Sequence, residues 1–191
     1  DGIVKIADIR ERILAKSPMG APYPWDGVTA ATFGRHPGQL IGFGAGTGIG
    51  KSDLFAAMID YDTRVLGVSV GVLSLEQDVT ETARRIAGKA IGKALHVPDG
   101  SWTEEELGGA IAALEKLPLA LYDSFGAIDW ETISSRIRYL AQVEGCQHIY
   151  LDHLTALAAA EDDERKALEK IMAEMAGMAK QTGVVIHFIS H

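Results

Sequence analysis

The sequence predicts an α/β fold with a mainly parallel sheet flanked by helices. Short apolar stretches of strand length alternate along the chain with stretches of helix length, which is the pattern of parallel strands joined by helices. A glycine-rich loop at residues 44–52 lies between an apolar stretch and a helical one, as in many folds of this class. The 191 residues suffice for one domain with a sizeable core.

The first segment, residues 3–16, is expected to form a short amphipathic helix. Four isoleucines recur in it at helical spacing: Ile3, Ile6, Ile9 and Ile13. Asp8 and Glu11 fit a capping box, and Pro18 ends the segment. The apolar stripe must be covered either by its own domain or by a neighbouring subunit, and the residues favour neither.

The remaining chain gives an irregular lead-in followed by alternating elements. Residues 17–38 hold four prolines and four glycines and are expected to be irregular. The expected strands are residues 40–43, 65–75, 119–122, 148–151 and 184–190, and the expected helices are residues 53–60, 78–95, 101–116, 129–144 and 161–181. Asp78 with Glu81 fits a capping box, Ser101 with Glu104 is expected to start the next helix, and Asp129 is expected to begin another.

Composition narrows the class of protein. The chain is 47% apolar and 23% charged, and no apolar run approaches the ~18 residues of a membrane span, so we expect a soluble protein with no membrane partner. A single cysteine, Cys146, cannot form an internal disulfide, which favours a reducing cytoplasm. The net charge of −8 argues against a broadly basic nucleic-acid surface but leaves room for a channel with a few cations. The first residue is not Met, so we expect a trimmed N-terminus.

The glycine-rich loop predicts a nucleoside triphosphate site. Its binding residues are expected to be Ala45, Gly46, Thr47, Gly48, Ile49, Gly50, Lys51 and Ser52, with Ala45 where the strict motif has glycine. The glycines let backbone N–H groups converge on phosphate oxygens, and the following helix adds its positive N-terminus. Lys51 can reach the β- and γ-phosphates, and the Ser52 hydroxyl can hold Mg²⁺.

Polar residues follow the expected strands at their carboxyl ends, where ligands bind in such sheets. Asp152 is expected on the Mg²⁺ side of the loop, the alternative being a helix cap or a loop residue. Glu76 is expected to be the catalytic base that deprotonates water, the alternative being a solvated side chain. His191 could report the state of the γ-phosphate or simply be exposed. His153 is expected to support the site rather than to react.

Asp123 and Ser124 follow the strand at residues 119–122. They could line the site or cap the next turn, and the pattern leans slightly towards the structural role.

These residues in this order resemble the helicase domain of bacteriophage primase-helicases, in the ring-forming DnaB and Twinkle group. The resemblance covers nearly the whole length, with residues 96–118 matching weakly. Its motifs are residues 1–13, 46–52, 75–76, 121–125, 151–153, 163–166 and 180–191.

The resemblance implies a RecA-like P-loop NTPase core in a hexameric ring that hydrolyses an NTP or dNTP with Mg²⁺ and translocates on single-stranded DNA. Glu76, Lys51 and His191 would be the catalytic residues, with His191 as the γ-phosphate sensor, and Ser52 and Asp152 would hold the metal. Residues 1–17 would be a linker helix that docks on a neighbouring subunit, and residues 18–191 the motor domain. Bacterial host cytoplasm is the implied location.

The resemblance also assigns the segment from Ala156 to Lys166 to the central channel. Arg165 and Lys166 are its candidate DNA contacts, and a solvated helix start is an equal alternative for both.

The family continues past the position of His191 with further strands, a second DNA-binding loop and an arginine finger. We therefore expect a core that is truncated at its C-terminal end and binds NTP better than it hydrolyses it, since such a finger contributes about 10³–10⁵ in rate. Two alternative functions remain: a RecA-like ATPase without unwinding activity, and a nucleotide-dependent assembly module.

Overall fold

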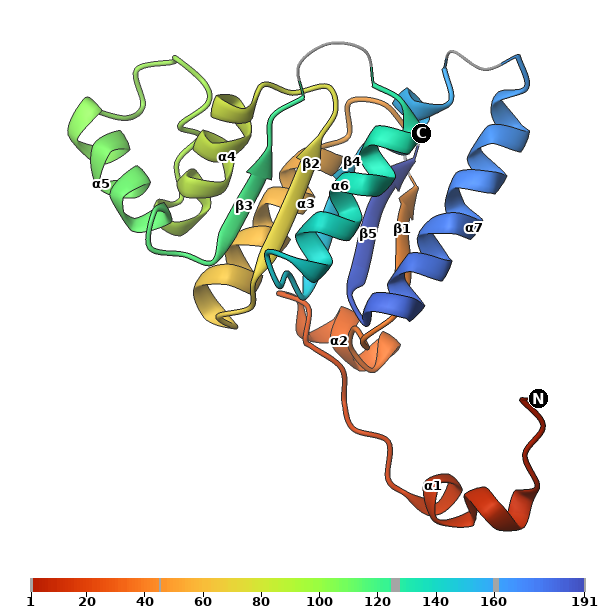
Figure 1. Cartoon of the computed structure of the whole chain (residues 1–191). Helices are drawn as coiled ribbons and strands as arrows, with labels where there is room; N and C mark the ends of the chain where they lie inside the picture. Colours follow the sequence, from red (N-terminus) through yellow and green to blue (C-terminus); the bar gives the residue numbers. More distant parts are fainter. Residues whose placement is uncertain (1, 45, 125–127, 160–161, 191) are drawn as a thin grey trace.

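The chain folds around one parallel sheet (Figure 1). The structure, a computed structural model, describes residues 2–44, 46–124, 128–159 and 162–190. Within them the sheet has five strands in the order β1-β5-β4-β2-β3, and each neighbouring pair is parallel. The strands are β1 (Leu40–Gly44), β2 (Val70–Ser74), β3 (Leu119–Tyr122), β4 (His148–Asp152) and β5 (Val185–Ser190). This confirms the predicted α/β fold class.

Helices cover both faces of the sheet. They are α3 (Lys51–Asp60), α4 (Val79–Ile91), α5 (Glu104–Leu114), α6 (Trp130–Gln142) and α7 (Glu164–Thr182). In Figure 1, α6 and α7 lie in front of the sheet and α3 lies behind it. Helix α4 packs against α3, and α5 against α4. None of the helices among the described residues has the length and apolar character that crossing a membrane requires.

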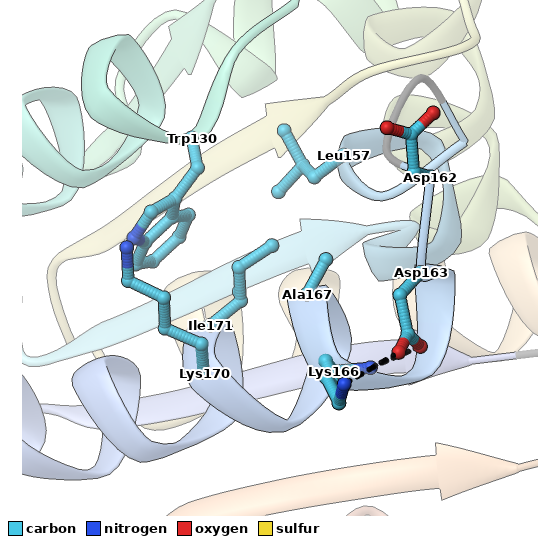
Figure 2. Close-up of a pocket in the computed structure, with 8 residues that line it drawn as sticks. All are labelled: Trp130, Leu157, Asp162, Asp163, Lys166, Ala167, Lys170 and Ile171. Carbon is cyan, nitrogen blue, oxygen red and sulfur yellow. Dashed lines mark hydrogen bonds and ion pairs between the residues drawn. The ribbon is translucent and has the colours of Figure 1, made fainter.

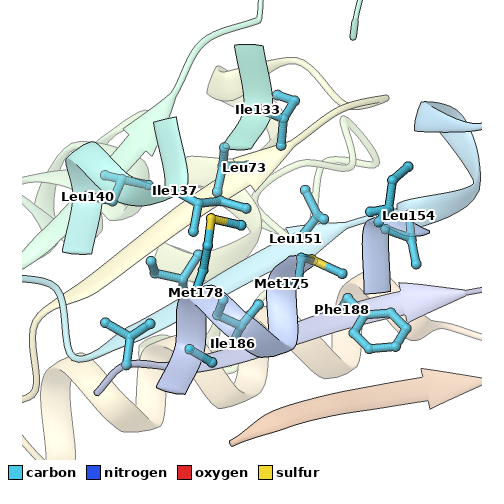
Figure 3. Packing of buried hydrophobic residues seen from close by; sticks show 14 of the residues in the cluster. Leu73, Ile133, Ile137, Leu140, Leu151, Leu154, Met175, Met178, Ile186 and Phe188 are labelled. Carbon is cyan, nitrogen blue, oxygen red and sulfur yellow. The ribbon is translucent and has the colours of Figure 1, made fainter. Parts of the chain in front are cut away.

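Alternate residues of the central strands serve two separate cores. Ile149 and Leu151 of β4 join a cluster with Ile137 of α6 and Met175 of α7 (Figure 3). Tyr150, between them in sequence, joins the cluster on the α3 face. Because both faces are buried, each central strand is apolar throughout, and this is why short apolar runs predicted them well.

Two of the predicted helix starts were correct and one was wrong. The side chain of Asp78 accepts the backbone N–H groups of Thr80 and Glu81, so Asp78 caps α4 as predicted. The side chain of Asp129 accepts the N–H of Thr132, which confirms that a helix begins there. The prediction of Ser101 with Glu104 was wrong. The capping box of α5 is formed instead by Thr103 and Glu106. Ser101 lies in a preceding turn, where its N–H donates to the Asp99 carboxylate at 2.9 Å.

The N-terminal segment differs most from expectation. The predicted helix over residues 3–16 is two short turns, a 3-10 turn at Ile6–Ile9 and α1 at Arg10–Leu14. The expected capping box at Asp8 was wrong, because neither turn has a side-chain cap. This arm projects away from the sheet in Figure 1. The lead-in, expected to be irregular, contains α2 (Asp26–Thr32).

The expected strand at residues 65–75 begins late, because α3 continues as a π-helical turn at Tyr61–Val65. The chain leaves that turn through Gly67, whose φ of +66° suits glycine. Within the turn, the Asp62 side chain points into the protein and pairs with Arg35 at 2.6 Å. This buried pair holds the end of α3 against the lead-in and leaves β2 to begin at Val70.

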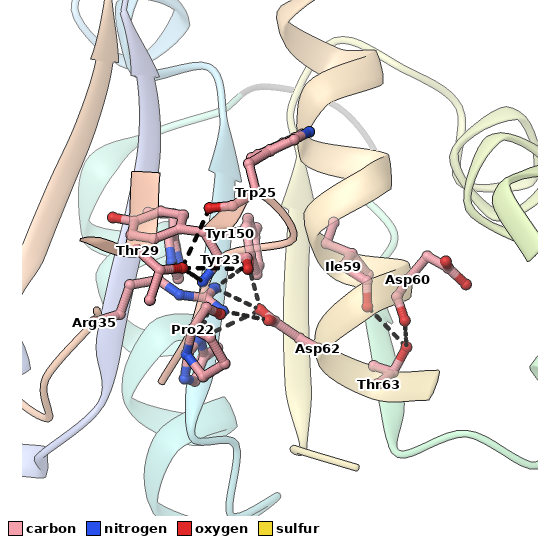
Figure 4. Close-up of polar contacts among 12 residues, drawn as sticks. Pro22, Tyr23, Trp25, Thr29, Arg35, Ile59, Asp60, Asp62, Thr63 and Tyr150 are labelled. Atoms are coloured by element: carbon pink, nitrogen blue, oxygen red, sulfur yellow. Dashed lines mark hydrogen bonds and ion pairs between the residues drawn. The ribbon is translucent and has the colours of Figure 1, made fainter. Parts of the chain in front are cut away.

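The Arg35–Asp62 pair is the centre of a buried polar cluster (Figure 4). We define it as Arg35, Asp62, His148, Tyr150 and His187, each at most 3% exposed. Arg35 donates to both carboxylate oxygens of Asp62 and, at 3.0 Å, to the Tyr150 hydroxyl. The His187 ring stacks on Tyr150 with centroids 4.1 Å apart.

Burial and pairing act in opposition on Asp62. Burial alone would raise the pKa of its carboxyl, but hydrogen bonds with His148 and Arg35 outweigh it and lower the pKa to about 2. Burial and the nearby positive charges lower the pKa of His187 to about 3. The cluster therefore holds an ionised Asp62 and a neutral His187 near neutral pH.

Candidate functional site

The glycine-rich loop connects β1 to α3 at the carboxyl edge of the sheet. Gly48 has a φ of +79° and Gly50 a φ of +89°, a left-handed backbone that glycine adopts without strain. Gly50 is the N-cap of α3 and provides no side chain to cap it. The first N–H groups of α3 are therefore available to an anion. Ala45 lies outside the described residues, so its predicted role stays a prediction.

Lys51 folds back over the loop. Its Nζ donates to the carbonyl oxygen of Gly46 at 3.0 Å, and the residue is 9% exposed. The ammonium is thus held among the backbone groups that would surround a phosphate. A mobile lysine would have to lose side-chain entropy on binding, and this one is already largely ordered.

Ser52 and Asp152 lie 100 residues apart in the sequence and come together in the fold. Ser52 lies in the first turn of α3, Asp152 ends β4, and the Ser52 hydroxyl donates to the Asp152 carboxylate at 2.6 Å. Asp152 is held in place by the sheet, where it pairs with Ser74 of β2. A hydroxyl and a carboxylate oxygen this close can bind the same small cation.

The donor set fits Mg²⁺ better than a transition metal. Within the described ranges, no group of three or more His, Cys, Asp or Glu side chains is arranged to hold an ion. A cation beside Ser52 and Asp152 would complete its shell with phosphate oxygens and water. Mg²⁺ binds in this way, through one or two carboxylates and substrate phosphates.

Glu76 lies beside this pair, just past the end of β2. Its side chain is 60% exposed, and its Oε1 is 2.9 Å from Nε2 of His153. The two strand ends are joined further by the N–H of Leu75, which donates to the Asp152 carbonyl at 2.7 Å. A carboxylate exposed at this edge is placed to receive a proton from water near a bound phosphate.

The contact between His153 and Glu76 was not predicted from the sequence. We expected His153 to support the site, but the residue that it contacts was not foreseen. The only signal in the sequence is its position directly after Asp152. His191 lies outside the described residues and its role as a sensor stays a prediction; its neighbour Ser190 pairs with Gly44 at the start of the loop.

The helix that follows the loop is anchored to α4. The carboxylate of Asp53 is 2.6 Å from Lys89 and 3.8 Å from Arg85. These two cations stand one turn apart on α4, so they tie the first turn of α3 to a neighbouring helix.

Asp123 is exposed, and α6 is capped by Asp129 rather than by Asp123 or Ser124.

Arg165 and Lys166 lie in the first turn of α7. Their side chains are 88% and 82% exposed, and each makes a local ion pair, Arg165 with Glu169 and Lys166 with Asp163. Lys166 also borders a pocket of about 350 Å³ between the starts of α6 and α7, with Trp130 and Lys170 on its wall (Figure 2). The structure does not bring these cations to the Ser52–Asp152 pair.

Comparison with known proteins gives consistent matches. A family model described as "DnaB-like helicase C terminal domain" matches residues 22–191. The DNA helicase/primase of Enterobacteria phage T3 is 28% identical over 210 residues, an alignment that covers 100% of this chain and 36% of that protein. The chain thus spans about a third of the length of that relative.

Two solved structures share the fold. A DnaB-like replicative helicase, solved to describe its interactions with primase, superposes with a TM-score of 0.79 at 20% identity, covering 97% of this chain and 48% of the other. A second structure, of an isolated ATPase domain, superposes with a TM-score of 0.75 at 20% identity, covering 100% of this chain and 71% of the other.

Proposed function

The chain belongs to the DnaB-like helicase C-terminal domain family, and we propose that it is the NTP-hydrolysing motor of a ring-shaped replicative DNA helicase. The observation that carries this proposal is the 2.6 Å contact between Ser52 and Asp152 beside an uncapped helix N-terminus. That arrangement suits a nucleoside triphosphate with its Mg²⁺.

In the proposed reaction the phosphates bind first. Backbone N–H groups of the loop and the N-terminus of α3 hold the phosphate oxygens, and Lys51 neutralises charge on the β- and γ-phosphates. Ser52 and Asp152 would hold Mg²⁺, which would offset further negative charge on these oxygens. The substrate is an NTP or dNTP.

Glu76 is the proposed base for hydrolysis. A water attacks the γ-phosphorus, the bond to the bridging oxygen breaks, and the proton of the water passes to the Glu76 carboxylate. The products are a nucleoside diphosphate and phosphate. The exposure of Glu76 at the strand end supports this role, since the base must be able to reach the attacking water. His191 is the proposed γ-phosphate sensor.

The proposed partners are single-stranded DNA and further copies of the chain in a hexameric ring. Residues 1–17 would dock on a neighbouring subunit, with residues 18–191 as the motor. The exposure of three of the four isoleucines supports this: Ile3 is 90% exposed, Ile6 72% and Ile13 55%. DNA would pass the exposed Arg165 and Lys166. Lys166 lines the pocket together with Trp130, and cations beside an aromatic ring suit single strands, although Asp162 and Asp163 also line this pocket. The phage relative suggests the cytoplasm of a bacterial host.

The experiment measures DNA-stimulated NTPase activity of the native-length protein and three variants. Lys51→Ala should abolish turnover and weaken nucleotide binding. Glu76→Gln should lower kcat by about 10²–10⁴ with nucleotide binding retained, because it removes only proton transfer. Asp152→Asn should weaken Mg²⁺-dependent nucleotide binding, measured by calorimetry with and without a chelator. DNA-independent hydrolysis by a stable monomer would contradict the proposal.

Two measurements separate the alternatives. Strand displacement on a forked DNA distinguishes a helicase from a related ATPase that does not unwind. Size measurement with a non-hydrolysable NTP tests for an assembly module, which would assemble without turnover. In that case Glu76→Gln would leave assembly and function unchanged.

A further inference from the structure

We propose that His153 is a positioning residue that holds the Glu76 carboxylate in place for proton transfer. This inference rests on the proposed role of Glu76 as the base. One ring nitrogen of His153 contacts Glu76, and the other contacts the backbone of the turn that follows. Its effect on the reaction passes through Glu76.

The need for such a residue follows from the exposure of Glu76. Its side chain is 60% exposed and has several rotatable bonds, so an unsupported carboxylate would sample many orientations. The His153 side chain is 9% exposed and is fixed by its surroundings. The 2.9 Å contact between Nε2 and Oε1 therefore ties a mobile group to a rigid one. A base held near its productive geometry contributes more to the rate than one that must find it.

The direction of the hydrogen bond can be deduced from the other ring nitrogen. The backbone N–H of Ala156 donates to Nδ1 of His153 at 3.3 Å, so Nδ1 presents its lone pair. In a neutral imidazole the proton then lies on Nε2, which donates to Glu76. A carboxylate has about four acceptor positions, so one donated bond leaves Glu76 able to take a proton from water.

The ring is itself held by the turn that follows it. His153 is the N-cap of a 3-10 turn at Leu154–Leu157, and its side chain accepts the Ala156 N–H as the cap. Leu154 is 1% exposed and Leu157 5% exposed, and both belong to the core under α6 and α7. The hydrophobic core thus orients the turn, the turn orients the ring, and the ring orients the base.

Two substitutions separate the two ring contacts. In His153→Asn, the side-chain oxygen can occupy the Nδ1 position and keep the cap, but the donor to Glu76 is lost. In His153→Gln, the longer amide can place an N–H near the Nε2 position and keep the donor, but the cap is lost. The two variants therefore form a matched pair. One loses the donor to Glu76 and the other loses the cap, so their rates show which of the two contacts matters.

We expect His153→Asn to lower kcat by about 10- to 100-fold, the usual size of a supporting-contact effect, with KM and affinity for a non-hydrolysable NTP unchanged. His153→Gln should restore kcat most of the way. In a Glu76→Gln background, His153→Asn should lower kcat no further, because residues that act as a unit are not additive. The assays use the native-length protein with saturating single-stranded DNA, and thermal unfolding is recorded for each variant.

The inference is overturned if His153→Asn keeps the wild-type kcat, or if both variants lose kcat equally. It is also overturned if the loss of kcat follows a loss of thermal stability, since His153 would then be merely structural. These outcomes differ from failure of the proposed function, in which the wild-type protein and Glu76→Gln would turn over NTP at the same rate.

Discussion

Strand β4 contributes residues to two polar sites that differ in burial and in role. At its amino end, His148 and Tyr150 belong to the buried cluster around Arg35 and Asp62, where the charged groups are paired and shielded from water. At its carboxyl end, Asp152 belongs to the candidate nucleotide site, which is open at Glu76. The buried cluster stabilises the fold, whereas the open site leaves its groups accessible to a ligand. Polar residues in the same strand thus serve stability or chemistry according to burial.

The largest expected effect comes from breaking the buried cluster. Arg35→Met leaves the Asp62 carboxylate buried without its cation, and such changes cost about 3–5 kcal/mol in the free energy of unfolding. The measurement is urea unfolding followed by circular dichroism. Arg165→Met is the matched control, because Arg165 pairs with Glu169 at the surface, where the two side chains are 88% and 64% exposed, and such pairs contribute about 1 kcal/mol or less.

The double variant Arg35→Met with Asp62→Leu sharpens this test. It removes both charges, so it should recover much of the loss, since replacing a whole buried pair by apolar groups is often close to neutral. If Arg35→Met costs no more than Arg165→Met, the cluster does not stabilise the fold.

The next effect is a loss of stability in acid that arises in the buried cluster. The folded-state pKa of His187 is lowered to about 3, so the unfolded state binds the extra proton between pH 6.5 and 3 and stability falls as the pH falls. The pKa of Asp62 is lowered to about 2, so its contribution is full above its ordinary pKa of 3.8 and is lost as the pH falls towards 2. Its share is about 2 kcal/mol.

Chemical unfolding at a series of pH values measures this. His187→Phe keeps a ring against Tyr150 and cannot take up the proton, so it should flatten the slope between pH 6.5 and 3 while leaving the drop at lower pH. An unchanged slope would place the acid sensitivity outside the cluster.

The two sites also differ in how far the sequence could predict them. The nucleotide site is marked by a local motif, and Glu76 and Asp152 each follow an apolar run, so strand ends alone place them at one edge. The buried cluster joins residues 35, 62, 148, 150 and 187, whose spacing has no pattern. Tyr150 and His187 lie within apolar strands, and only the packing of α3 against the sheet brings Asp62 to them.

The other errors have two causes. The apolar run that predicts a strand at residues 65–75 cannot reveal that α3 continues past Asp60 to deliver Asp62, because a tertiary contact sets that boundary. The cap at Thr103 was missed because Ser101 fits the same local pattern and loses only to the preceding turn. Local signals predicted the strands β1 to β5 and the helices α3 to α7, but they missed α2 and misplaced several boundaries.

The smallest effect on stability belongs to Lys166, at the exposed edge of the candidate DNA path. Lys166→Ala removes an ion pair with Asp163 that lies at the surface, so the free energy of unfolding should change by about 0.5 kcal/mol or less. Affinity for single-stranded DNA should nevertheless fall, and the slope of log affinity against log salt should decrease by about 1 if Lys166 contacts one phosphate. Lys180→Ala, exposed near the other end of α7, is the control.

Lys166 and Arg35 thus test the two extremes of burial, an exposed cation and a buried one. Arg35 is buried and paired, and its removal should cost stability without a direct contact to any ligand. Lys166 is exposed and only locally paired, and its removal should cost binding with little change in stability. If Lys166→Ala and Lys180→Ala have equal salt slopes, the start of α7 is a solvated helix end, and exposure of a cation on this acidic protein is not enough to mark a DNA contact.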